Sequence, residues 1–305
     1  MRFLAILPIL LCAAALVLSF LCLFAGSSKG FMEEYALVTL NTSQFGSTLF
    51  NTSESSTNPF LSLLDNATNS IESSLNADLA SVAQDLGLHD FYSAHILNYC
   101  EGYYTPGPVP NATLSKHDIH RNITACSNKT AGYTFDPRAT LAHELNTSTN
   151  GLAGKLNLTD LNWPAEIDKG LHALRIASIA MFALYCVGIA FIALALLLAL
   201  ASIFFQGRLS SFVNVLVDCL AFLAIGLASA IATAIAVKAA DVINSYGKDV
   251  GISAQKGSRF LVLTWVATAL MLGASLTWCA ECVAGRGAKR TRRSEKRGYG
   301  EDGGY

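Results

Sequence analysis

Four long apolar runs constrain this chain more than any other feature of its sequence. A helical run of about 20 apolar residues is long enough to cross the hydrocarbon core of a bilayer. Soluble cores do not need helices that are this long and apolar on every face. The 305 residues are 52% hydrophobic and only 14% charged, which also favours a membrane protein. We therefore predict a mainly α fold, a bundle of four transmembrane helices. The four runs are Phe3–Ala25, Ile176–Phe205, Phe212–Val237 and Phe260–Val283.

All N-glycosylation sequons of the chain lie between the first and the second run. In each of them an Asn is followed two residues later by Ser or Thr, with no Pro between. This number is well above the roughly three sequons that chance would place in a stretch of this composition. An unmodified loop rich in Asn, Ser and Thr is the alternative. The sequons predict that the stretch is glycosylated and extracellular, and they are Asn41, Asn51, Asn66, Asn111, Asn122, Asn128, Asn146 and Asn157.

Clustered cations predict a cytoplasmic carboxyl-terminal end, because Lys and Arg near spans concentrate on the inner side. The first run could instead be a cleaved signal peptide, since Arg2 precedes it and small residues follow Ala25. Its length exceeds the roughly 7 to 15 residues of a signal h-region, so we favour an uncleaved span with a cytoplasmic amino end. The cations that follow the fourth span, and that we expect to contact anionic lipid headgroups, are Arg286, Lys289, Arg290, Arg292, Arg293, Lys296 and Arg297.

This orientation divides the chain into eight segments. A loop as long as the first one is expected to fold as a domain of its own. Its apolar residues between 71 and 86 recur at spacings of three and four, which predicts a helical segment, and residues 139–175 repeat the trend with interruptions at Gly and Pro. The segments are 1–25 (transmembrane helix 1), 26–175 (extracellular loop domain), 176–205 (helix 2), 206–211 (cytoplasmic turn), 212–237 (helix 3), 238–259 (extracellular loop), 260–283 (helix 4) and 284–305 (basic cytoplasmic tail).

Two of the eight cysteines, Cys100 and Cys126, lie in the large loop. In an oxidising compartment a disulfide between them is the default, and two free thiols are the alternative. Such a bridge would stabilise the loop by roughly 3 to 4 kcal/mol. Cys279 and Cys282 lie where the fourth span ends, beside the cations, so they are candidates for palmitoylation, with plain packing as the alternative. They lack the partners that a zinc site needs.

No arrangement of residues indicates an enzyme, a cofactor or a metal site. The six histidines all lie in the loop domain, and His117 and His120 are spaced like weak candidates for metal ligands. We find no nucleotide-binding loop and no triad of Ser, His and Asp. Asp218, one helical turn after Asn214 in the third run, would suit a transport role, but a simple polar contact is the favoured interpretation. Small residues four apart, such as Gly226 and Ala230, favour close helix packing.

One segment of the loop resembles a known family. The segment from Asp90 to Gly102 contains Asn-Tyr-Cys-Glu-Gly at residues 98–102, and Cys126 and Phe135-Asp136-Pro137 follow it. This pattern, together with four spans and a large first loop, is similar to the fungal four-span family of cortical-patch (eisosome) and PalI-type membrane proteins. The resemblance implies a claudin-like bundle in the plasma membrane, with Cys100 and Cys126 as the paired family cysteines. The Trp and Gly-Leu-Trp of animal claudins are absent, so the likeness to claudins concerns architecture only.

The resemblance implies a non-enzymatic organiser of cortical membrane domains, with roles in cell-wall integrity or endocytosis. We expect as partners anionic or sterol-rich membrane lipids, other copies of the chain, other eisosome proteins and the cell wall, but no nucleic acid. The first alternative is a PalI-like subunit of a complex that senses ambient pH. The second alternative is a transporter or channel that uses Asp218.

Overall fold

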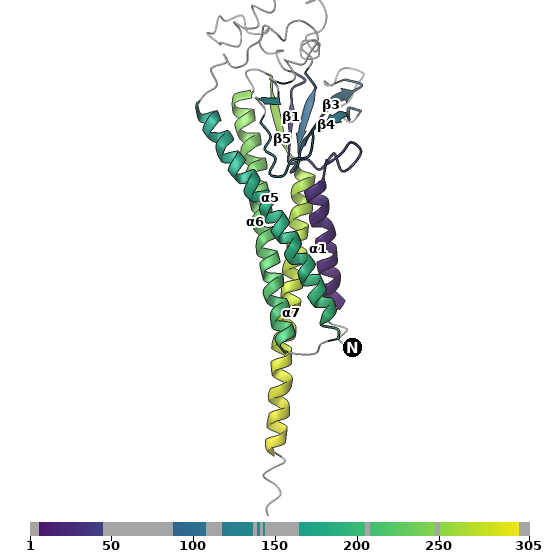
Figure 1. Cartoon of the computed structure of the whole chain (residues 1–305), viewed down its shortest axis with the longest axis vertical. Coiled ribbons are helices and arrows are strands. Elements are labelled where there is room, and N and C mark those ends of the chain that lie inside the picture. Colours follow the sequence, from purple (N-terminus) through teal and green to yellow (C-terminus); the bar gives the residue numbers. More distant parts are fainter. Residues whose placement is uncertain are drawn as a thin grey trace, which may run out of the picture. The chain divides into compact units, whose positions relative to one another are not determined.

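The computed structural model describes residues 6–44, 88–107, 118–136, 139–140, 143, 165–204, 208–247 and 251–298. Four long helices dominate these residues (Figure 1). Each of the four is long and apolar enough to cross a membrane, as the sequence predicts. They are α1 (Ile6–Phe24), α5 (Ala165–Ala201), α6 (Arg208–Gly247) and α7 (Ser258–Gly298).

Three of these helices extend beyond the apolar runs that predict them. α5 begins at Ala165, before the predicted span, and α6 continues to Gly247, past the predicted end at Val237. α7 continues to Gly298, so it includes most of the segment that the sequence assigns to a basic tail. Hydropathy marks where a helix can enter lipid, whereas the helical backbone continues as long as propensity and hydrogen bonding allow.

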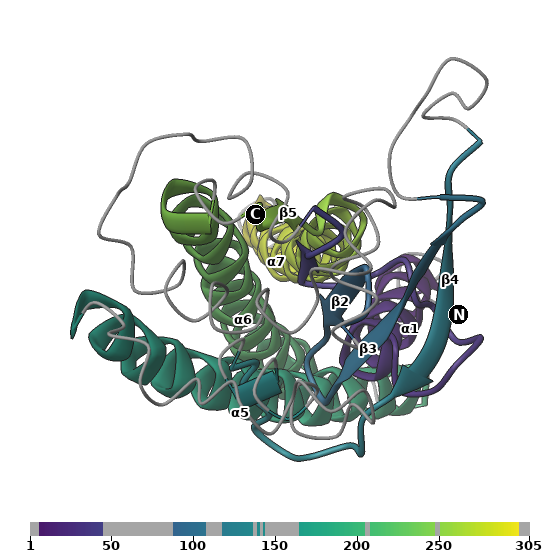
Figure 2. The ribbon, with the colours of Figure 1, turned by 90° about the horizontal axis from the view of Figure 1, so that it is seen from above.

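The described residues include a β-sheet, four strands of which lie in the large loop, and the sequence pattern did not predict it. Five short antiparallel strands pair in the order β4-β3-β2-β1-β5, and Figure 2 shows β4, β3 and β2 side by side. The helical segment predicted at residues 71–86 lies outside the described residues. The strands are β1 (Val38–Asn41), β2 (Phe91–Ala94), β3 (Tyr99–Thr105), β4 (His120–Cys126) and β5 (Ser253–Lys256).

The fifth strand comes from the short connection between α6 and α7, far along the chain from the other four. β5 pairs with β1 in the register Val38 to Lys256 and Asn41 to Ser253. Its outer edge is covered by a side chain of α6, because the Asn244 amide donates to the carbonyl of Ala254 (2.9 Å) and accepts from the Ala254 N–H (2.8 Å). These contacts occupy the outward-facing backbone groups of Ala254 and so reduce the tendency of this edge to pair with another strand.

The chain divides into two compact units. One unit holds residues 1–22, 183–230 and 262–305, and its interior is formed by helices. Its largest fully buried side chains include Tyr185, Ile192, Ile225, Met271 and Trp278. The other unit holds residues 23–182 and 231–261, with the sheet and the flanking helix segments.

Candidate functional site

The family-like motif at residues 98–102 comprises Asn98 and the first four residues of β3. Cys100 is joined to Cys126 of β4 by a disulfide, and the two residues are direct partners in the strand register. The Asn98 amide donates to the carbonyls of Gly26 (3.0 Å) and Ser127 (3.3 Å). Asn98 therefore ties the turn after α1 to the segment after β4.

Gly102 allows β3 and β4 to approach each other closely. A Cβ atom at this position would collide with the backbone oxygen of Asn122, and it would lie 2.8 Å from Cα of Ile123. The register of the two strands shifts between Glu101 and Gly102, which marks an irregularity in the ladder. Only glycine fits this approach without movement of the backbone.

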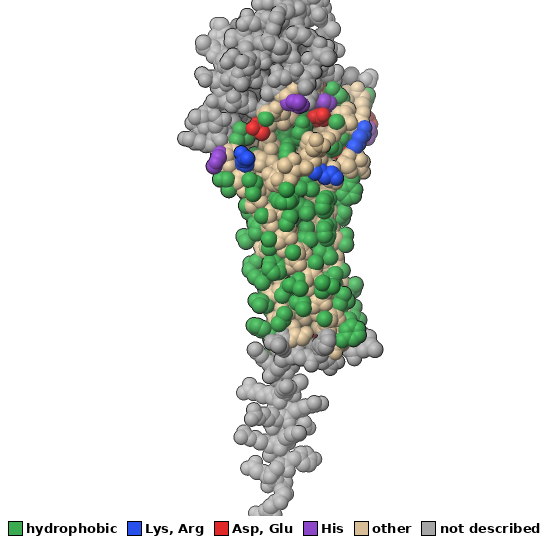
Figure 3. All heavy atoms as spheres, viewed as in Figure 1, with side chains coloured by type: hydrophobic (Ala, Val, Ile, Leu, Met, Phe, Trp, Pro, Cys, Tyr) green, Lys and Arg blue, Asp and Glu red, His purple; other side chains and the backbone are tan. Residues whose placement is uncertain are grey.

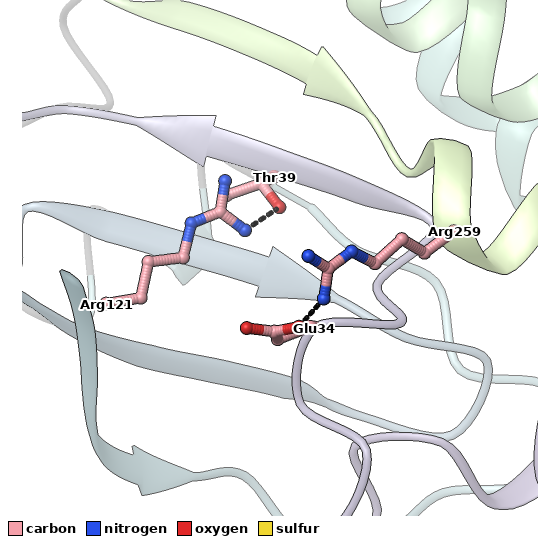
Figure 4. A network of polar contacts seen from close by, with 4 residues as sticks. All are labelled: Glu34, Thr39, Arg121 and Arg259. Carbon is pink, nitrogen blue, oxygen red and sulfur yellow. Dashed lines mark hydrogen bonds and ion pairs between the residues drawn. The ribbon is translucent and has the colours of Figure 1, made fainter. Parts of the chain in front are cut away.

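The disulfide face of the sheet carries a small apolar cluster. Phe91, Cys100 and Ile123 are buried there, and Tyr104 packs against them. The guanidinium of Arg121 lies 5.7 Å from the centroid of the Phe91 ring. It also donates to the Thr39 hydroxyl at 3.5 Å (Figure 4). The same view shows the exposed ion pair of Glu34 with Arg259. Burial raises the pKa of Tyr104, although nearby Arg121 acts in the opposite direction.

Aromatic rings gather on the other face of the sheet. Tyr99 precedes Cys100 in β3, so its side chain points away from the disulfide face. The Tyr99 ring stacks with that of Tyr133 at 6.3 Å and tilts against Phe135 at 6.0 Å. Burial raises the pKa of the Tyr133 phenol. The motif thus supplies Cys100 to one face of the sheet and Tyr99 to the other.

His95 is the most deeply buried described histidine. Its side chain is 4% exposed, and its ring lies against Gly26, where a Cβ atom would overlap the ring. Gly26 has a φ of +66°, a conformation that glycine adopts without strain. Burial lowers the pKa of His95 to about 4, with the backbone at Tyr35 acting in the opposite direction. The ring is therefore neutral at physiological pH.

Three of the eight sequons lie in the described residues. Asn122 and Asn128 are exposed, on β4 and just after it. Asn41, at the end of β1, is half-buried, and its amide oxygen accepts hydrogen bonds from the N–H (3.0 Å) and the hydroxyl (2.7 Å) of Ser43. The sequons outside the described residues are Asn51, Asn66, Asn111, Asn146 and Asn157.

The helical unit contains a hydrogen-bonded polar cluster that the sequence analysis missed. The hydroxyls of Tyr185 and Thr264 lie 2.5 Å apart, and Ser229 lies 2.7 Å from Thr264 and 3.0 Å from Thr268. All four side chains are buried. They join α5, α6 and α7, as polar groups between membrane helices commonly do. Single Ser, Thr and Tyr residues within apolar runs do not reveal from the sequence which of them contact one another in the folded chain.

Asp218 lies inside the helical unit, one helical turn after Asn214. Both side chains are 1% exposed. The Cys12 thiol donates a hydrogen bond to Oδ1 of Asp218, with 3.7 Å between sulfur and oxygen. Oδ2 of Asp218 and both polar atoms of the Asn214 amide have no hydrogen-bonding protein partner. The sequence favoured a simple polar contact for Asp218, but the described contacts satisfy only part of this pair.

Other predicted site residues lie on α7. Cys279 is a free, exposed cysteine, and Cys282 lies one helical turn further on. The side chains of Cys282 and of the basic residues Arg286, Lys289, Arg290, Arg292, Arg293, Lys296 and Arg297 lie outside the described residues. No group of three or more His, Cys, Asp or Glu side chains that could hold a metal ion occurs among the described residues. His117 is not described, so its pairing with His120 is untested.

Comparison with known proteins agrees with this architecture. A family model for the SUR7/PalI family matches residues 4–277. The SUR7 family protein pun1 of Schizosaccharomyces pombe is 33% identical over 107 residues, which cover 35% of this chain and 31% of that relative. No solved structure matches the chain. Because the family match covers the first three apolar helices, the bridged sheet and most of the fourth candidate span, the chain is a multi-pass membrane protein that belongs to the SUR7/PalI family.

Proposed function

We propose that this protein is a non-enzymatic integral protein of the plasma membrane that organises cortical domains resembling eisosomes. Its roles would be in cell-wall integrity or endocytosis. The family match across residues 4–277 is the observation that carries this proposal. The proposed partners are anionic or sterol-rich lipids, further copies of the chain, other eisosome proteins and the cell wall. Both chain ends would be cytoplasmic, and the sheet would face the outside.

The outer surface of the helices supports lateral association in lipid. Hydrophobic side chains cover the helices on the face shown in Figure 3, and many of them are large and exposed. On α6, Leu223 (54%), Leu227 (56%) and Ala230 are exposed, whereas Gly226 faces α7 of the same chain, since a Cβ there would lie 3.5 Å from Cγ2 of Thr268. The small Ala230 beside exposed leucines lets a second helix approach closely. By contrast, Ala228 and Ala232 are already buried within the chain.

The predicted cytoplasmic end supplies a second attachment to the membrane. Palmitoylation of Cys279 and Cys282 would add acyl chains beside the cluster of cations, which runs from Arg286 to Arg297. Each cation near an anionic surface contributes about 1 kcal/mol. This combination would favour membrane regions that are rich in anionic lipid.

The experiment is imaging of a fluorescent fusion beside an eisosome marker. We expect the wild-type protein to form static patches that overlap the marker. Ala230→Leu should disperse the patches, because the larger side chain at this exposed α6 position keeps a second helix away. Gly170→Leu is the control, since a Cβ at this exposed α5 position meets nothing within 4 Å. Diffuse wild-type fluorescence, or normal patches in the Ala230→Leu variant, would contradict the proposal.

The alternative is a PalI-like subunit of an ambient pH-sensing complex, because the family that matches includes PalI proteins. In that case, deletion of the gene should abolish growth at alkaline pH while cortical patches keep their number. The organiser proposal expects the reverse, with altered patches and normal alkaline growth. The two functions are therefore separable in one deletion strain.

A further inference from the structure

The pair formed by Asn214 and Asp218 has an arrangement that helix packing alone does not explain. The two residues are one turn apart on α6, so they lie on the same face of the helix. Each is 1% exposed, and three of their four polar side-chain atoms have no hydrogen-bonding protein partner. Only Oδ1 of Asp218 has one, the thiol of Cys12 at 3.7 Å, which is a weak donor.

A second polar group on the same helix provides the comparison. Further along α6, the Ser229 hydroxyl bonds to the Ile225 carbonyl (2.8 Å) and lies within 3.0 Å of the hydroxyls of Thr264 and Thr268. That cluster is satisfied by the protein itself and serves to join helices. The Asn214 and Asp218 pair is not satisfied in this way. Because unsatisfied polar groups within a membrane cost several kcal/mol, the pair calls for a bound ligand.

The chemistry of the pair identifies the ligand class. Carboxylate and amide oxygens are hard donors that suit alkali and alkaline-earth cations. The pair carries one negative charge, which a monovalent cation would neutralise, whereas a divalent cation would leave an uncompensated positive charge among apolar side chains. Transition metals would need further ligands, and the described residues hold no group of three or more His, Cys, Asp or Glu for them.

We propose that the Asn214 amide oxygen and the Asp218 carboxylate bind a monovalent alkali cation inside the helical unit. Asp218 supplies the charge, and Asn214 supplies a neutral oxygen and an N–H donor for a bound water. The Cys12 thiol donates to the carboxylate oxygen Oδ1 and holds the side chain in position. The bound cation neutralises Asp218 and so makes the stability of the helical unit depend on cation concentration.

The test is thermal unfolding of the purified full-length chain in lipid nanodiscs at pH 8. NaCl, KCl and LiCl are titrated separately against N-methylglucamine chloride at constant ionic strength. We expect at least one alkali cation to raise the midpoint in a saturable way, by about 3 °C or more. Asp218→Asn should abolish this rise. Asp241→Asn, the same change at an exposed α6 position, should retain it.

Two outcomes overturn the proposal. One is a wild-type midpoint that does not depend on which cation is present. The other is an equal rise in wild-type and Asp218→Asn protein. If Asp218→Asn does not fold, the Asn214→Ala variant is measured instead. The proposal expects its half-saturating cation concentration to be at least ten times that of the wild type. An unchanged half-saturating concentration overturns the proposal. A proton bound to Asp218 instead of a cation would show as stability that falls with rising pH in every salt.

Discussion

At the scale of single residues, Gly102 sets how closely β3 and β4 can pair. A Cβ there would meet backbone atoms of Asn122 and Ile123, which cannot rotate away as a flexible side chain can. We expect Gly102→Ala to lower the free energy of unfolding of the sheet unit by at least about 2 kcal/mol. Limited proteolysis of the full-length protein, followed over a temperature series, measures this loss.

Gly170→Ala is the control for that substitution. Gly170 lies in α5, and a Cβ built there meets nothing within 4 Å. Alanine in a helix interior is favoured over glycine by about 1 kcal/mol, so this variant should be neutral or slightly stabilised. Equal proteolysis of the Gly102→Ala variant and the wild type would show that the strands can separate at low cost.

His95 makes the stability of the sheet unit depend on pH. Its pKa is about 4 in the folded chain, below the ordinary value of 6.5, because burial disfavours the charged ring. Between these two values the unfolded chain binds more protons, so the free energy of unfolding falls as the pH falls from 6.5 to 4. The full loss below pH 4 is about 3 kcal/mol. Above pH 6.5 this residue has no effect on the pH dependence.

His95→Gln tests this dependence, because glutamine does not titrate. We expect the variant to be less stable at pH 7, since the packing against Gly26 changes. Its loss of stability between pH 6.5 and 4 should nevertheless be smaller than that of the wild type. His120→Gln, at an exposed position on β4, should leave the profile of the wild type intact. Parallel profiles for wild type and His95→Gln would assign the acid sensitivity to other groups.

At the scale of elements, the disulfide joins two strands that are also hydrogen-bonded neighbours. Cys100 and Cys126 are separated by 26 positions in the sequence. Closing a loop of this length stabilises a folded chain by roughly 3 to 4 kcal/mol. We expect Cys100→Ser combined with Cys126→Ser to reduce the amount of protein that leaves the secretory pathway. Cys186→Ser, which removes an exposed free thiol, should have no effect. A normal amount of the double variant at the cell surface would show that the pairing of β3 with β4 is stable without the disulfide.

The helices and the sheet differ in how far the sequence predicts them. Each apolar run is long enough to span a bilayer and needs no partner to be recognised, so the sequence predicts all four helices. Strands β1, β2 and β5 have four residues each, which is too short for an alternating pattern to stand out. β5 also pairs with a strand more than 200 positions earlier, and no local signal reports such a contact. The same holds for the cluster of Tyr185, Ser229 and Thr264.

At the scale of the whole molecule, helices and sheet depend on each other through the chain connections. The strand β5 lies between α6 and α7, and it completes the sheet by pairing with β1, which follows α1. Sheet formation therefore requires that the chain segments after α1 and after α6 emerge on the same side of the membrane. Four spans place them so, because α1 and α6 are separated by one span that returns through the bilayer. The topology proposed from the sequons has this property.

That orientation leads to a prediction about glycosylation. If the sheet faces the lumen during synthesis, Asn122 and Asn128 should carry glycans, since both are exposed. Asn122→Gln and Asn128→Gln should each increase electrophoretic mobility by one glycan, and endoglycosidase should remove the difference. Asn41→Gln should change mobility little, because the Asn41 side chain is half-buried at the end of β1. Mobility unaffected by endoglycosidase, with the segment after α7 digested by protease added to intact cells, would mean that the protein has the opposite orientation.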